Sequence, residues 1–443
     1  METSPANHDP TVTAADRVRQ VRRAVIASTV GSAIEWYDFI LYSIATTLVF
    51  PSVFFAGSDL LAGELKSTAV FAIGFLARPV GAIIFGHYGD KLGRKASLVA
   101  TLLLMGIGTF TVGLLPSYAQ AGPWGGLALV AFRFLQGIGV GGEWSGAVLV
   151  AMEWAPPGRR GFFASWPQVG VPLGLILANL AFGAAAAVSG SSFLSWGWRV
   201  PFLLSGILVI VGLLIRIGVE ETPVFKAMAQ HRQLQKRPVL AALRTDWRKI
   251  GKTAMLRISE LSNYQVMTVF VYTFVTQTLH LPRQFTFTAI LCAAVLAVIF
   301  VPVFGAVSDR FGRKRTFMTG VALTGVFGFA YFALLSTGVP TIVFITIAVC
   351  LIPHAMQYGP EAAFITESFA AGTRYSGSAV GYQLASIVAG PVPAITVALF
   401  AYDPSGYAIA FYLGVCAIIS LTSAYFMPGS LSRPHPLRHA EAA

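Results

Sequence analysis

Long apolar runs recur along the whole chain, and they constrain its fold more than any other feature of the sequence. A helix needs about 20 apolar residues to cross the hydrocarbon core of a bilayer. In lipid the backbone N–H and C=O groups must bond within the protein, so runs of this length are expected to be helices. The sequence therefore predicts an all-α polytopic membrane protein with twelve transmembrane helices, at roughly 24–50, 65–88, 97–116, 125–152, 162–187, 199–219, 252–279, 286–307, 316–336, 339–359, 376–401 and 406–427.

Composition and charge support this interpretation and predict the orientation of the helices. Only 11% of the residues are charged, whereas soluble domains carry about 25%. With the N-terminus in the cytoplasm, 25 of the 31 Lys and Arg fall in cytoplasmic segments. Because positively charged loops favour the cytoplasm, both termini are expected there. The net charge of +12 then reflects topology and contact with anionic lipid, and it does not indicate nucleic-acid binding.

The twelve segments divide into two halves of six. We expect a cytoplasmic N-terminal tail at 1–23, a first bundle at 24–219 and a second bundle at 252–427. The polar, basic stretch 220–251 is expected to be a cytoplasmic linker, and 428–443 a cytoplasmic C-terminal tail.

A charged motif between the second and third segments returns in the second half. "GHYGDKLGRKAS" at 86–97 reappears as "GAVSDRFGRKRT" at 305–316, with an offset of 219. A loop that only needs positive charge would explain the Lys and Arg, but not the shared Gly and Asp positions. Gly93 and Gly312 permit a tight reversal between helices. We therefore infer a duplication of six helices, a feature typical of transporter folds.

The repeated Gly-x-x-x-Asp-x-x-Gly-Arg-Lys motif resembles the signature loop of the major facilitator superfamily. Other stretches resemble its metabolite:H+ symporter family, whose members carry shikimate, 2-oxoglutarate, citrate, and proline or betaine. The resemblance implies a 6+6 pseudo-symmetric fold, alternating access and a place in the bacterial cytoplasmic (inner) membrane. The stretches that carry it are "EWYDF" (35–39), "ARPVGAIIFGHYGDKLGRK" (77–95), "RFLQGIGVGGEWSGA" (133–147), "SWGWRVPF" (195–202), "EETPVF" (220–225) and "RYSG" (374–377).

The same resemblance implies a gate on the cytoplasmic side. Glu153 and Arg160 are seven residues apart after the fourth segment, and Glu367 and Arg374 are seven apart after the tenth. In the superfamily such residues join the loop Asp and Arg in ion-pair networks that close the cytoplasmic side when the carrier opens outward. We expect two such networks: Asp90, Arg94, Glu153 and Arg160 in the first half, and Asp309, Arg313, Glu367 and Arg374 in the second.

Ionisable residues inside the predicted helices are costly, and by default they mark function. Asp38 and Glu35 lie three residues apart on one face of the first segment, and we expect Asp38 to be the first proton carrier and Glu35 the second. Arg133 is the candidate ligand for a substrate carboxylate, because a guanidinium binds a carboxylate through two parallel hydrogen bonds. Further candidates for substrate contact are Tyr42, Gln136, Trp144, Gln168, Tyr264, Gln357, Tyr358 and Gln383.

Other interior charges remain open between structural and functional roles. Arg257 and Glu260 are as consistent with a structural pair as with a binding site. Arg78 precedes a proline in a family motif and suits a structural or gating role. His354 suits a buried histidine or a proton site equally well. The open set is Arg78, Glu143, Arg257, Glu260, His354 and Glu361.

Together these features predict a monomeric secondary carrier that takes up a small organic anion with protons. Its expected partners are the anion, protons and membrane lipids, with no cofactor, metal or nucleic acid. A zwitterion such as proline or betaine is the alternative substrate, sodium is the alternative coupling ion, and a transport-inactive sensor is an alternative of another class. No motif for zinc or nucleophilic catalysis is visible, so an enzyme is not expected.

Overall fold

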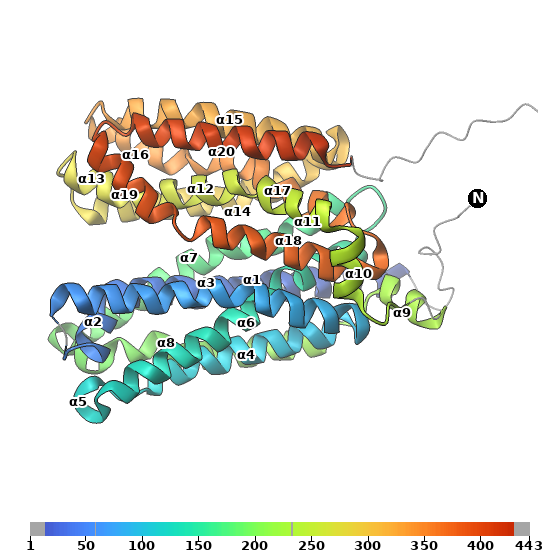
Figure 1. Cartoon of the computed structure of the whole chain (residues 1–443), viewed down its shortest axis with the longest axis horizontal. Coiled ribbons are helices and arrows are strands. Elements are labelled where there is room, and N and C mark those ends of the chain that lie inside the picture. The colour runs from blue at the N-terminus through green and yellow to red at the C-terminus, as the bar shows by residue number, and fades with distance from the viewer. Residues whose placement is uncertain (1–13, 58, 232–233, 429–443) are drawn as a thin grey trace, which may run out of the picture.

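The chain folds into two helical bundles that lie side by side along their length (Figure 1). The computed structural model describes residues 14–57, 59–231 and 234–428. The first bundle contains α1 (Ala14–Leu48), α2 (Phe50–Phe54), α3 (Leu60–Lys91), α4 (Arg94–Leu114), α5 (Tyr118–Ala121), α6 (Pro123–Glu153), α7 (Arg160–Ser189), the short η1 (Gly190–Ser192) and η2 (Phe193–Gly197), and α8 (Arg199–Ile217). The second contains α11 (Trp247–Leu256), α12 (Ile258–Gln265), η3 (Val266–Phe270), α13 (Val271–Gln277), α14 (Arg283–Phe311), α15 (Arg313–Leu335), α16 (Pro340–Val349), α17 (Leu351–Glu367), η4 (Ala371–Thr373), α18 (Arg374–Ala389), α19 (Val392–Tyr402) and α20 (Tyr407–Phe426).

Eleven of the described helices are long and apolar enough to cross a membrane, whereas the sequence predicts twelve. The difference lies in the seventh predicted segment, 252–279. There the chain is divided among α11, α12, the π-helical η3 and α13. The division begins at Arg257, whose buried side chain is the centre of a charged cluster. The polar side chains of α12 thus interrupt the apolar run that the sequence suggested.

Two glycines make the sharp reversals that the repeated loop motif predicts. Gly93 separates α3 from α4 with φ of 115°, and Gly312 separates α14 from α15 with φ of 95°. Side chains rarely adopt these backbone angles, so glycine is favoured at both positions. The two loops therefore have the same local geometry in the two halves, as expected for a duplication.

The two bundles meet along three pairs of helices. α3 of the first bundle packs against α18 of the second, and α7 packs against α14 and α17. The linker helices α9 (Pro223–Gln230) and α10 (Pro238–Thr245) lie at one end of the bundles, near the start of α11 (Figure 1). α10 contacts both α3 and α18, so the linker touches both halves at this end.

Small residues let α1 and α7 approach closely within the first bundle. A Cβ atom at Gly174 would contact Trp36 Cβ and the backbone nitrogen of Tyr37 in α1. Gly183, in the same helix, faces open space, with no atom within 4 Å of a Cβ placed there. The two glycines therefore provide a matched pair for testing how closely the helices must pack.

Gly174→Val is expected to destabilise the protein by about 1–3 kcal/mol, the usual cost of overpacking. The added methyl groups would meet the backbone of α1, which cannot move aside as a flexible side chain can. Thermal unfolding in detergent measures the effect, with Gly183→Val as the control that keeps the wild-type melting temperature. Equal melting temperatures for the two variants would contradict the packing described here.

Candidate functional site

Asp38 lies in α1 at the end of a buried chain of hydrogen bonds from three helices. Gln136 of α6 donates from Nε2 to Thr109 Oγ1 of α4 at 2.7 Å, and that hydroxyl donates to Asp38 Oδ2 at 2.7 Å. The other carboxylate oxygen of Asp38 is buried and has no hydrogen-bond partner among residues 14–57, 59–231 and 234–428. The sequence does not single out Thr109, because a threonine in an apolar segment carries no signal of its own.

Arg133 of α6 is enclosed by aromatic rings. Its guanidinium carbon lies 4.2 Å from the ring centre of Tyr42, 5.0 Å from that of Phe71 and 5.8 Å from that of Phe39. Within the described residues no acidic side chain forms an ion pair with Arg133, and its buried Nε lacks a hydrogen-bond partner. Arg133 also lies within electrostatic reach of Asp38. The structure thus brings a cation and a carboxylate together without pairing them.

Glu143 is paired within the first bundle. Its carboxylate binds Arg216 of α8 and accepts a hydrogen bond from Thr101 Oγ1 of α4 at 2.6 Å. Arg216 lies in the last turn of α8, next to the basic linker in the sequence. The Arg216 side chain is 3% exposed. It turns inward because it pairs with Glu143 and donates a hydrogen bond to the carbonyl oxygen of Leu98. Glu35, which is also buried, lies within electrostatic reach of this pair.

Arg78 of α3 is buried without an ion pair in the described part of the chain. Its guanidinium carbon lies 4.6 Å from the ring centre of Phe75 and 5.0 Å from that of Phe39. The Phe39 ring therefore lies close to the guanidinium groups of both Arg78 and Arg133.

The second bundle holds a denser cluster of charges around Arg257. The guanidinium donates to Glu361 Oε1 from Nε and to Glu260 Oε2 from Nη2, both at 2.9 Å. Its carbon lies 3.3 Å from the ring centre of Tyr382. His354 Nε2 is 3.5 Å from Glu260 Oε1. The open residues Arg257, Glu260, His354 and Glu361 thus form one cluster, from α12, α17 and the junction that precedes α12.

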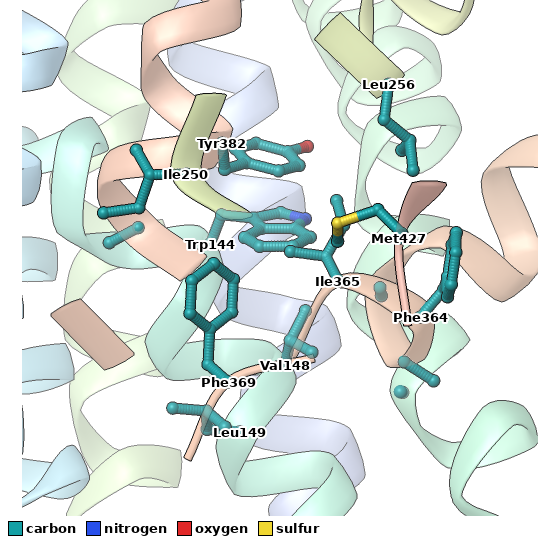
Figure 2. Packing of buried hydrophobic residues seen from close by; sticks show 14 of the residues in the cluster. Trp144, Val148, Leu149, Ile250, Leu256, Phe364, Ile365, Phe369, Tyr382 and Met427 are labelled. Atoms are coloured by element: carbon teal, nitrogen blue, oxygen red, sulfur yellow. The ribbon is translucent and has the colours of Figure 1, made fainter. Parts of the chain in front are cut away.

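Several predicted substrate contacts lie where the two halves meet. Trp144 of α6 stacks on Tyr382 of α18 at 3.5 Å between ring centres, within a cluster of residues from both bundles (Figure 2). The Trp144 indole donates to Gln168 Oε1, and Gln168 Nε2 donates to the carbonyl oxygen of Tyr358 at 3.2 Å. Gln383 Nε2 donates to the carbonyl oxygen of Val140. Tyr382 is an interface residue that the sequence does not reveal.

Gln357 and Tyr264 occupy related positions in the second bundle. Gln357 Nε2 donates to Thr324 Oγ1 of α15 at 3.4 Å, which repeats the bond from Gln136 to Thr109 in the first bundle. The Tyr264 ring lies 6.0 Å from Trp36 of α1 and 5.7 Å from His354. Tyr264 therefore lies between His354 of the charged cluster and Trp36 of the first bundle.

The repeated loop aspartates each cap a helix of the opposite bundle. Asp90 of α3 accepts from the backbone N–H of Tyr375 at 3.3 Å and of Ser376 at 2.9 Å, in the first turn of α18. Asp309 of α14 accepts from the N–H of Gly161 at 2.9 Å and of Phe162 at 2.8 Å, in the first turn of α7. Neither helix receives a side-chain cap from its own N-cap residue.

The ion pairs around these caps differ in part from the predicted networks. Arg94 pairs with Asp90 and Glu153, each at 3.6 Å. Arg313 likewise pairs with Asp309 at 2.7 Å and with Glu367 at 3.6 Å. Arg374, however, lies 3.9 Å from Glu153 of the other bundle.

Arg160 pairs with neither Asp90 nor Glu153 among the described residues, so the prediction of a closed first-half network that includes it is wrong. The reason is the docking of α7 and α18. α18 carries Arg374 to α6, whereas α7 carries Arg160 to the second bundle.

The motif "EETPVF" (220–225) contacts α4 and α6 beside these ion pairs. Glu221 accepts from the backbone N–H of Arg94 at 3.1 Å and of Lys95 at 3.2 Å, and so caps α4. Thr222 Oγ1 donates to Glu153 Oε2 at 2.5 Å. The start of the linker is thereby attached to the loop motif, a role that the linker sequence alone does not indicate.

Tyr375 of α18 inserts its ring into the first bundle. Its hydroxyl donates to the carbonyl oxygen of Gly142 at 2.6 Å and lies 3.1 Å from Ser97 Oγ. A side chain at Gly89 or Gly146 would collide with the tyrosine. The glycines of the two family motifs therefore leave space for a residue of the opposite half.

Two family models match the chain. The model described as "Sugar (and other) transporter" matches residues 24–269, and the one described as "Major Facilitator Superfamily" matches residues 258–442. Among solved structures, the proton:xylose symporter XylE bound to 6-bromo-6-deoxy-D-glucose superposes with a TM-score of 0.77. It covers 94% of this chain and 98% of that one at 18% identity. The predicted 6+6 fold is thus confirmed.

Curated relatives span nearly the whole chain. A shikimate transporter of Escherichia coli K12 is 39% identical over 93% of this chain and 95% of its own length. The inner membrane metabolite transport protein YhjE of the same strain is 38% identical, over 90% and 92%. A proline/betaine transporter of Salmonella typhimurium LT2 is 31% identical, over 94% and 85%. These families and relatives are transporters and not enzymes.

Asp90→Ala is expected to weaken the contact between the bundles at this end, because α18 loses the cap for its first turn. A lost cap costs about 0.5–2 kcal/mol, so the ratio of closed to open molecules should fall about 2- to 30-fold. Spin labels at the exposed positions Leu92 and Phe311, in a cysteine-free background, report the separation of the two loops.

Asp403→Ala is the matched control, because Asp403 caps α20 within its own bundle, accepting from Ala408 N–H at 2.9 Å. It should leave the distance distribution unchanged. Asp90→Asn retains an acceptor for the cap and should shift the ratio less than alanine does. If Asp90→Ala gave the same distribution of spin-label distances as the wild type, the cap would not contribute to the contact between the bundles.

Proposed function

This chain belongs to the major facilitator superfamily, and we propose that it takes up a small organic acid together with protons. The family matches and relatives establish a multi-pass membrane transporter, and the relatives support a place in the bacterial inner membrane. The carried solute, the proton coupling and the cytoplasmic position of both termini are our proposals. The observation that supports them best is the unpaired state of Asp38 and Arg133.

Asp38 is suited to carry the coupled proton. A charged carboxylate without a counter-ion is unfavourable inside a membrane protein. One oxygen of Asp38 accepts from Thr109, while the other is buried without a partner. A proton on that free oxygen removes the unpaired charge when the site is closed, and water can receive the proton when the site opens. Glu35, on the same face of α1, is proposed as a second proton site.

Arg133 is suited to bind the carboxylate of the substrate. A guanidinium that already had an acidic partner would have to exchange it, whereas Arg133 holds only aromatic faces. The N–H groups of its guanidinium therefore remain available for two parallel hydrogen bonds to a carboxylate. Gln136, whose Oε1 has no partner, and Tyr42 lie beside it and can orient the rest of the solute.

The caps at one end supply a gate for alternating access. Asp90 and Asp309 hold helices of the opposite bundle, so this end is closed in the structure. The substrate and proton residues are buried, and a solute reaches them only when the two bundles separate. We propose that this closed end faces the cytoplasm and that rocking of the bundles breaks the caps during uptake.

A zwitterion is the second candidate, and the Arg257 cluster favours it. Glu361 Oε2 is buried without a partner, and the rings of Tyr264 and Tyr358 lie 5.7 Å and 5.3 Å from the His354 ring. A carboxylate beside aromatic faces suits a cationic ammonium group. A proline or betaine-like solute would then place its carboxylate at Arg133 and its cation at this cluster.

Asp38→Asn is expected to abolish accumulation driven by an inward proton gradient in proteoliposomes. Uptake of the labelled acid should fall to the level that a protonophore gives with the wild type, because asparagine cannot take up the proton. Exchange of labelled for unlabelled solute at equal pH should persist, since the substrate contacts remain. The exposed Glu64→Gln serves as the control. Wild-type accumulation by Asp38→Asn would exclude Asp38 as the coupling residue.

Arg133→Gln is expected to weaken substrate binding about 10- to 150-fold, the range for losing a hydrogen bond to a charged group. The panel comprises shikimate, dicarboxylates, citrate, aromatic acids, proline and betaine, and the readout is the KM for uptake. Arg133→Lys keeps the charge but not the paired hydrogen bonds, so its defect should be intermediate. An unchanged KM in Arg133→Gln would assign the carboxylate to another residue, first of all Arg257.

A further inference from the structure

A groove on the outer surface of the second bundle lies away from the contact between the halves. It has a volume of about 520 Å³, within the range of about 300–1,000 Å³ that small-molecule sites occupy. Its walls come from α11 and the last turns of α20, which lie in the same bundle (Figure 1). The lining residues are Trp247, Arg248, Gly251, Lys252, Met255, Ile418, Ile419, Thr422, Ser423 and Phe426.

One end of the groove is basic. Arg248 is exposed and has no ion pair among the described residues, and its guanidinium carbon lies 5.3 Å from the ring centre of Trp247. Lys252 donates only to a backbone oxygen, that of Phe426, at 2.7 Å. The neighbouring Lys249 is different, because Asp246 pairs with it at 2.7 Å. Two cations of the groove thus lack an acidic partner.

The other end of the groove is apolar. Met255 lies seven residues after Arg248 in α11, which places it about 10 Å further along the helix axis. Ile418 and Ile419 of α20 line the groove beside it. The side chains of Trp247, Ile418 and Phe426 are each more than 60% exposed, as expected for a surface that faces lipid. The groove therefore runs from a charged mouth to an apolar floor.

We propose that this groove binds an anionic phospholipid, with its phosphate at Arg248 and Lys252 and its acyl chain along Met255 and Ile418. Basic pockets at the cytoplasmic ends of membrane helices bind acidic headgroups, and this inference rests on the proposed function, in which this end of the molecule faces the cytoplasm. Trp247 suits the boundary between headgroup and hydrocarbon. The site is independent of the transported solute and of the proton residues.

Gly251 allows the groove to be filled without disturbing the fold. No atom lies within 4 Å of a Cβ placed at this position, so a larger side chain would occupy open space. Gly251→Leu therefore blocks the groove while leaving both cations in place. Arg248→Gln removes a charge while leaving the space. The two variants test the same site by different physical routes.

Native mass spectrometry of the purified full chain, equilibrated with vesicles of phosphatidylglycerol or phosphatidylcholine, counts the lipids that remain bound. We expect the wild type to retain phosphatidylglycerol in preference to phosphatidylcholine. Arg248→Gln should lower the retained phosphatidylglycerol about fivefold, and Gly251→Leu should lower it at least as much. Arg315→Gln, an exposed cation of the same bundle, and Gly183→Leu, on an open face of α7, should match the wild type.

Thermal unfolding of the same proteins shows whether each variant is folded and whether the lipid stabilises it. Phosphatidylglycerol should raise the melting temperature of the wild type and of both controls, but not that of Gly251→Leu. Inorganic phosphate alone should raise none of them, because the acyl chain contributes to binding. Wild-type lipid retention by both Arg248→Gln and Gly251→Leu would overturn the proposal, as would equal retention of the two lipids by the wild type.

Discussion

The exchange of helix caps between the two bundles is the interaction on which the described arrangement depends. The first N–H groups of a helix have no partners within that helix. In α7 and α18 these groups are satisfied by Asp309 and Asp90, which belong to the opposite bundle. Separation of the bundles at this end must therefore expose two helix termini and two aspartates together. This coupling explains why Gly, Asp and Arg recur at matched positions in both loops.

The two halves share a framework but differ in the charges that they hold. A glutamine bonded to a threonine on the preceding long helix occurs in both, as Gln136 with Thr109 and as Gln357 with Thr324. Among the residues that the structure describes, an aspartate joins this pair in the first half only, where Thr109 donates to Asp38. When "EWYDF" (35–39) is aligned with "ELSNY" (260–264), Asp38 falls on Asn263, which donates to the carbonyl oxygen of Ser259 in its own helix at 2.8 Å. The duplicated scaffold thus carries an aspartate at the end of this hydrogen-bond chain in the first half, where we propose the coupling site.

Buried charges in this protein fall into paired and unpaired sets. Glu143 with Arg216, and Arg257 with Glu260 and Glu361, have their partners within one bundle. Breaking a buried pair by removing one partner is strongly destabilising, so these groups contribute to the integrity of each half. Asp38, Arg133 and Arg78 have no ion-pair partner within the described part of the chain. The unpaired set includes Asp38 and Arg133, for which we propose proton and substrate binding.

The sequence by itself determined the helical membrane fold, the duplication and the two loop motifs, because run length, glycine positions and charge spacing are local properties. It also identified Asp38, Arg133 and the polar residues between the halves, since an ionisable or amide side chain in an apolar run is conspicuous. It could not reveal that Thr109 serves Asp38, that Arg216 turns inward to Glu143 or that Tyr375 enters the first bundle. Those contacts join segments from 71 to 278 residues apart. The docking of α7 and α18 across the interface decided that Arg374 pairs with Glu153 while Arg160 does not. The sequence could not determine this, because the spacing of residues along the chain does not show how the two bundles pack against each other.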